Sequence, residues 1–157
     1  MRTLLVPALA ATALALFGPP HIRVTAVTGN PPTPGAVISV VTQHHTQEED
    51  AQITAEAATM RDGQRVTKTL TVTKAAETGH YGVTKQWEDG TPWVLTFTIK
   101  QGPNGSHGTA SALVKIDAKG SITGIEELME RNLRGDQYPR GATMKDVEKA
   151  LRELSGQ

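Results

Sequence analysis

Apolar and polar residues alternate along most of this chain, which is the pattern of half-buried β-strands. Two strictly alternating runs flank one short turn within residues 79–100, and together they predict a β-hairpin. Its inward positions include the large aromatic side chains Tyr81, Trp87, Trp93 and Phe97. Because aromatic side chains bury large areas, we expect this hairpin to form the centre of the core, with the two tryptophans closing one end. The alternative is an exposed aromatic platform for a partner or a sugar.

Further alternating runs predict strands on both sides of this hairpin, at residues 22–26, 36–42, 53–57, 66–73 and 110–116. The sequence Arg61-Asp62-Gly63-Gln64 carries the Asp-Gly signal of a tight turn between two of them. Strands at a spacing of about ten residues are typical of an antiparallel sandwich. We therefore predict a mainly β fold, a seven-stranded antiparallel immunoglobulin-like β-sandwich over residues 19–122.

The periodicity becomes helical after residue 122. Thr123-Gly124-Ile125-Glu126 has the form of a capping box, and the helix that it predicts would end at Gly135. A second helix is predicted to start at Thr143, with one apolar stripe: Met144, Val147, Ala150, Leu151 and Leu154. Residues 123–157 are thus expected to be a short two-helix C-terminal extension. Such short helices need a surface to pack on, and the protein's own sheet is favoured over a partner.

The N-terminus indicates the cell compartment. Met1-Arg2 supplies one positive charge, and residues 4–17 are almost entirely apolar. This run is short for a membrane span and is typical of a signal peptide, which we assign to residues 1–18. The protein is therefore expected to be secreted or periplasmic. An uncleaved signal anchor is the alternative, and it is the one route by which we expect contact with a membrane.

Composition excludes several kinds of partner and chemistry. The chain of 157 residues has 16 Lys and Arg against 16 Asp and Glu, with no basic stripe, so nucleic acid is not an expected partner. The absence of cysteine excludes disulfides, thiolate metal sites and cysteine nucleophiles. Ser106 and His107 are adjacent, whereas a catalytic triad is assembled from separate elements, and no Gly-x-Ser-x-Gly motif occurs. We expect a non-enzymatic protein.

The histidines fall in loops that strand order places at one end of the predicted sandwich. With nearby carboxylates they form a candidate site for Cu(II) or Zn(II): His44, His45, His80, His107, Glu48 and Asp50. Since His44 and His45 are neighbours in an extended segment, only one of them would easily join a shared site. The alternative interpretation is that these are ordinary polar loop residues at the surface.

Several motifs resemble a known family, the YtkA-like and FixH-like extracytoplasmic domains, over residues 21–117. The motifs that carry the resemblance are residues 34–41, Ile53-Thr54-Ala55-Glu56-Ala57, Arg61-Asp62-Gly63, Gly79-His80-Tyr81 and Gly90-Thr91-Pro92-Trp93-Val94-Leu95. The resemblance implies an immunoglobulin-like fold outside the cytoplasm. It also implies an association with copper handling or cytochrome oxidase assembly.

Three functions follow as hypotheses. The first is a non-enzymatic exported binding or accessory module without a defined cofactor. The second is a periplasmic Cu(II) or Zn(II) carrier that uses the histidine-bearing loops. The third is a structural or adhesive module that docks a protein partner through the tail stripe of Met144, Val147, Leu151 and Leu154.

Overall fold

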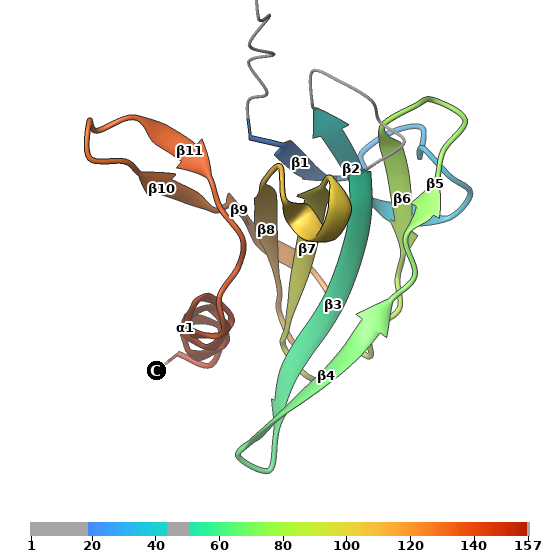
Figure 1. Ribbon diagram of the computed structural model, residues 1–157. Helices are drawn as coiled ribbons and strands as arrows, with labels where there is room; N and C mark the ends of the chain where they lie inside the picture. The colour runs from blue at the N-terminus through green and yellow to red at the C-terminus, as the bar shows by residue number, and fades with distance from the viewer. Residues whose placement is uncertain (1–18, 44–50, 157) are drawn as a thin grey trace, which may run out of the picture.

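A computed structural model describes residues 19–43 and 51–156 of the protein. These residues form a sandwich of two antiparallel β-sheets with one C-terminal helix (Figure 1). Sheet A has the order β1-β2-β6-β5: His21–Ala26, Ala36–Gln43, His80–Thr84 and Thr73–Lys74. Sheet B has the order β4-β3-β7-β8-β9: Gln64–Leu70, Ala51–Arg61, Trp93–Gln101, Thr109–Ile116 and Ile122–Glu127. A short 3₁₀ turn, η2 (Pro103–Gly105), lies between β7 and β8.

The core lies between the two sheets, where the inward positions of each strand meet. The alternation predicts the inward residues of β7 correctly, since Trp93, Leu95, Phe97 and Ile99 are all at most 1% exposed. The same holds for β8, with Ala110, Ala112, Val114 and Ile116. Sheet A contributes a smaller set of buried side chains: Ile22, Val24, Ile38, Val40 and Val83. The mainly β, sandwich-like class is therefore confirmed.

The count of seven strands is wrong, because the described residues form eleven strands. Part of the difference lies between β4 and β6, where the two-residue strand β5 pairs with β6. The rest lies after residue 117. There the turn at Asp117 does not end the sheet but leads into β9, which pairs with β8.

The predicted central hairpin is also wrong. Strand β6 pairs with β2 and β5 in sheet A, whereas β7 pairs with β3 and β8 in sheet B. The segment between them therefore crosses from one sheet to the other. Alternation identifies which face of a strand is buried but does not identify its hydrogen-bonded neighbour, and two facing strands of opposite sheets show the same pattern as a hairpin.

The helix predicted to start at Thr123 is wrong as well, because residues Ile122–Glu127 form β9. The Thr123 hydroxyl donates to the Lys115 carbonyl oxygen across the strand pair instead of capping a helix. Two short strands follow, β10 (Met129–Arg131) and β11 (Gln137–Pro139), which pair with each other. Pairing with β8 satisfies the backbone of a segment whose β-branched residues favour a strand and whose Gly124 disfavours a helix.

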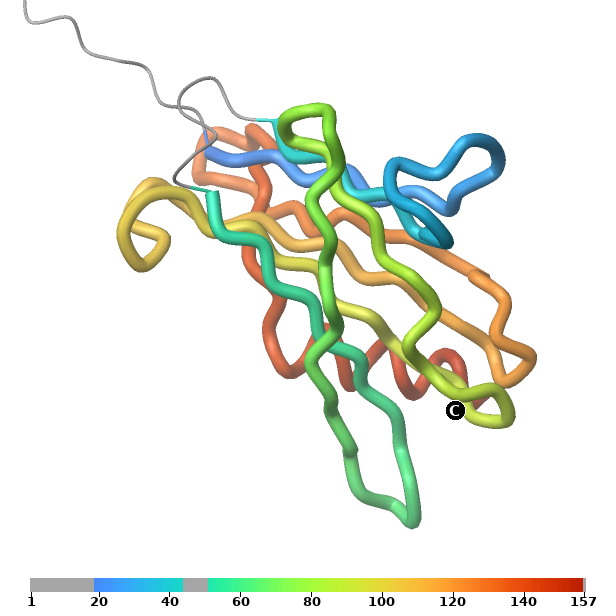
Figure 2. Tube along the Cα trace, turned by 90° about the vertical axis from the view of Figure 1, so that its right-hand side faces the viewer, coloured from blue at the N-terminus to red at the C-terminus, as the bar shows by residue number. Residues whose placement is uncertain are grey.

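The second predicted helix is confirmed. Helix α1 (Met144–Leu154) begins with a capping box between Thr143 and Asp146. It packs on the outer face of sheet B, opposite the core, in a second apolar cluster: Ala58, Val94, Leu113, Leu128, Ala150 and Leu151. Figure 2 shows the helix lying behind the sheet, away from sheet A.

The predicted signal peptide, residues 1–18, lies outside the described residues. In the part of the chain that the structure describes, no helix has the length and apolar character needed to cross a membrane.

Candidate functional site

A cleft separates helix α1 from the β3–β4 hairpin on the outer face of sheet B. Strand β3 has 11 residues and extends past its neighbours, so that the hairpin projects beyond the rest of the sandwich (Figure 1). Its turn is the predicted Asp-Gly turn, since Asp62 and Gly63 both have positive φ, 50° and 74°. The helix covers only part of this sheet face, and the uncovered part forms the floor of the cleft.

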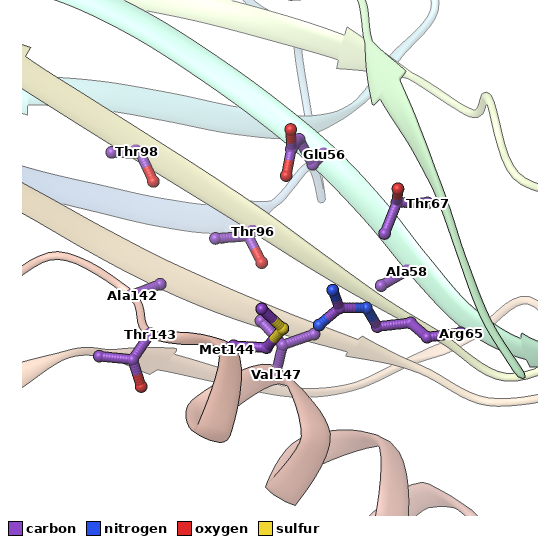
Figure 3. Close-up of a pocket in the computed structure, with 10 residues that line it drawn as sticks. All are labelled: Glu56, Ala58, Arg65, Thr67, Thr96, Thr98, Ala142, Thr143, Met144 and Val147. Atoms are coloured by element: carbon purple, nitrogen blue, oxygen red, sulfur yellow. The ribbon is translucent and has the colours of Figure 1, made fainter.

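The first of two cavities in this cleft has a volume of about 270 Å³ and lies beside the N-terminal turn of α1. Threonines from two strands of sheet B line its floor: Thr67, Thr96 and Thr98. The helix contributes Met144 and Val147. Figure 3 shows the side chain of Arg65 extending from β4 toward these two helix residues, and Glu56 standing on the floor.

The second cavity has a volume of about 350 Å³ and lies farther along the helix, beside the tip of the hairpin. The hairpin contributes Met60, Gly63 and Arg65, while the helix and the residue after it contribute Glu148, Leu151, Arg152 and Ser155. Arg65 lines both cavities, so the two lie next to each other between the hairpin and the helix.

The charged side chains that line the cleft have no ion-pair partner among the described residues, unlike several of those around it. Within residues 19–43 and 51–156, Arg65, Arg152, Glu56 and Glu148 form no ion pair. By contrast, Lys115 on β8 pairs with Glu153 on the helix. The charges that fix the helix on the sheet are thus paired, and those that face the cleft are available to a ligand.

Two ion pairs fix the helix that forms one wall of the cleft. Arg140 donates two hydrogen bonds to the Asp146 carboxylate, at 2.7 and 2.8 Å. Asp146 also accepts from the Thr143 backbone N–H at 2.7 Å. These hydrogen bonds, above all those from Arg140, hold the pKa of Asp146 well below its usual range. At the other end of the helix, the Lys115 pair lowers the pKa of Glu153.

The comparisons with known proteins give no assignment for this arrangement. No family model, curated protein or solved structure matches the chain. The cleft is therefore interpreted from its own side chains.

The predicted metal ligands fall into two groups. His44, His45, Glu48 and Asp50 lie outside the described residues. His80 and His107 are described, and they lie at the same end of the sandwich as His21, because His21 pairs with Gln43, His80 pairs with Val41 and Gly108 approaches Pro20.

Among residues 19–43 and 51–156, one carboxylate lies close to His80. The His80 Nδ1 atom lies 3.6 Å from Glu77 Oε1 and 3.1 Å from the Thr78 carbonyl oxygen. Among the described residues, no group of three His, Asp or Glu side chains could hold a metal ion. The metal site that includes the loop histidines stays a prediction.

The predicted partner surface is used mainly within the protein. Leu151 is buried at 3% exposure, and Val147 and Leu154 pack partly buried on the same cluster. Only Met144, at 59% exposure, presents a free apolar side chain, and it lines the cleft. The stripe thus packs on the protein's own sheet, which was the favoured alternative.

The two tryptophans close one end of the core, as expected. Trp87 is 5% exposed and Trp93 is 1% exposed. The Trp93 indole N–H donates to the Glu88 carbonyl oxygen at 3.0 Å, and Lys68 Nζ lies 5.0 Å from the ring centroid. Neither indole forms an exposed platform.

Proposed function

We propose that this protein is a non-enzymatic exported binding module whose ligand site is the cleft between helix α1 and the β3–β4 hairpin. One observation carries the proposal: two neighbouring cavities that share Arg65 lie between two elements that are far apart in the sequence. Clefts of this size that combine apolar walls with a few polar groups are the usual sites for small ligands.

The kinds of side chain in the cleft support binding over catalysis. The residues that line the two cavities offer threonine hydroxyls, apolar side chains and unpaired charges. Hydroxyls and charges of this kind hold a ligand by hydrogen bonds and Coulomb attraction.

The finer fold assignment is part of the proposal. The order β1-β2-β6-β5 corresponds to the strand order ABED of an immunoglobulin-type sandwich, and β4-β3-β7-β8 corresponds to C′CFG. This correspondence supports an immunoglobulin-like fold. An immunoglobulin-like fold is compatible with the resemblance to the YtkA-like and FixH-like extracytoplasmic domains. The apolar run at the N-terminus separately supports export.

A small-molecule fragment screen followed by amide chemical shifts of ¹⁵N-labelled protein tests the proposal. We expect the fragments that bind to shift amides of the cleft-lining residues, such as Arg65, Thr96 and Val147. Amides at the histidine end of the sandwich, such as those of His80 and His107, serve as the internal reference. If fragments of varied charge shift no cleft amides, or shift only the reference amides, the proposed site is wrong.

A further inference from the structure

We infer that the cleft takes an amphiphilic carboxylate, a molecule with one anionic head and one flexible apolar chain. This inference rests on the proposed function, since it names the ligand class of the same cleft. It follows from where the cleft is charged and where it is apolar.

The anionic head fits the second cavity, where two arginines come from different elements. Arg65 lies on β4 and Arg152 lies on α1, and neither has an ion-pair partner among the described residues. Glu148 is the one acidic residue that lines this cavity, so the two arginines leave it with a net positive charge, and the other acidic residue of the cleft, Glu56, lines the first cavity. Arginine guanidinium groups match a carboxylate with paired hydrogen bonds, and the net positive charge favours an anion over a cation.

The apolar chain fits the side chains that lie beside these arginines. Met60, at 40% exposure, and Leu151 line the second cavity. Met144, at 59% exposure, and Val147 line the first. Methionine side chains are flexible and polarizable, so they adapt to an alkyl chain better than branched residues do. Met60 from the hairpin and Met144 from the helix, one in each cavity, are therefore available to cover such a chain.

The first experiment compares three probes that share a decyl chain and differ in the head group: decanoate, decanol and decylammonium. Each is titrated into the protein below its micelle concentration, with binding followed by calorimetry and by the cleft amide shifts. We expect decanoate to bind at least about fivefold more tightly than decanol, with decylammonium the weakest. We also expect affinity to rise several-fold for every two methylenes from hexanoate to decanoate, because each buried methylene adds to the transfer free energy.

Charge-removing variants then locate the head group. Arg65→Gln and Arg152→Gln are each expected to weaken decanoate binding about fivefold and to leave decanol binding unchanged. Arg131→Gln, an exposed arginine on β10 that does not line the cleft, is the matched control and should change neither. Unchanged thermal midpoints would show that all three variants are folded.

The outcomes separate the inference from the proposed function. If decanol binds as tightly as decanoate, or if both cleft variants retain wild-type affinity for decanoate, the ligand class is wrong and the cleft remains a binding site for other chemistry. If no probe of any charge shifts the cleft amides and the fragment screen also fails there, the inference and the proposed function are both wrong.

Discussion

The guanidinium group of Arg140 and the carboxylate of Asp146 form a two-point ion pair at the start of helix α1, with N–O distances of 2.7 and 2.8 Å. Arg140 lies in the segment that links β11 to the helix, and its backbone oxygen accepts from Ser111 on β8. The ion pair therefore connects the helix cap to sheet B through the linking segment. It fixes the position of the wall of the cleft.

Replacement of Asp146 is expected to destabilise the protein in a pH-dependent way. Asp146→Asn should lower the free energy of unfolding by about 1–2 kcal/mol near neutral pH, because it removes the carboxylate charge that pairs with Arg140. The pKa of Asp146 is lower in the folded protein than its usual value. Its stabilising effect is thus fully present above about pH 4 to 5, and it is lost as pH falls toward the folded-state pKa.

Urea unfolding of wild type and Asp146→Asn between about pH 3 and pH 7 measures this difference. We expect the gap between the two proteins to shrink toward acid. Glu148→Gln, on the same helix and without an ion-pair partner among the described residues, is the control. A gap of constant size across this range would contradict the assigned role of the ion pair.

Gly82 on β6 is expected to tolerate no side chain. A Cβ atom at this position would lie 1.9 Å from Thr33 Oγ1 and 2.9 Å from Ala36 Cβ. Because Thr33 is only 6% exposed, it has little room to move. Gly82→Ala should therefore cost about 1–3 kcal/mol of stability by overpacking.

Gly124 on β9 provides the matched comparison for Gly82. It also lies in a strand, but its added Cβ would meet only the Lys115 side chain, at 3.6 Å and beyond. Gly124→Ala should change stability by less than about 0.5 kcal/mol in denaturant titrations. Equal effects of the two substitutions would show that the loop containing Thr33 does not lie against β6 as described.

Leu128 and Leu133 distinguish the observed strands from the helix that the sequence predicts. In that helix both leucines would share one buried face. In the structure Leu128 is 4% exposed, whereas Leu133 is 108% exposed at the tip of the β10–β11 hairpin. Leu128→Ala should cost about 2–4 kcal/mol, and Leu133→Ala should be neutral within about 0.5 kcal/mol. Similar costs for both, measured by thermal or urea unfolding, would favour the helix.

Lys68 on β4 is expected to stabilise the tryptophan end of the core. Its ammonium lies 5.0 Å from the Trp93 ring centroid and 3.5 Å from Glu88 Oε1. Lys68→Met keeps the apolar stem and removes the charge, and it should lower stability by about 0.5–1 kcal/mol. Lys74→Met, at an exposed position on β5, is the control. A loss of the same size at both lysines would point to a general effect of net charge.

The sequence was informative wherever one face of a segment is buried. The alternation around Phe97 and Val114 assigned both strands and their inward faces, because burial on one side imposes a period of two. The Asp62-Gly63 turn and the Thr143 cap were also correct, since each depends on local chemistry. Which strands pair with each other is not predictable in this way, and the predicted pairing of β6 with β7 is wrong.

The cleft lay beyond prediction for a related reason. Arg65 and Arg152 come from elements that are far apart in the sequence, and exposed side chains leave no periodic signal of where a helix will dock. The apolar outer positions Val94 and Leu113 were not interpreted as a docking surface for α1. Those two residues were the available signal, because an outer sheet position that is fully apolar needs a cover.

Helix α1 belongs to the last part of the sequence, yet it covers a sheet face formed by strands that are made much earlier. A nascent chain that has completed β8 and β9 carries Val94, Leu113 and Ala58 as an open apolar patch on a folded sheet. Docking of the helix is the step that removes this patch from solvent. A nonsense mutation before Met144 would therefore yield a product that contains the whole sandwich but is prone to aggregate through this patch.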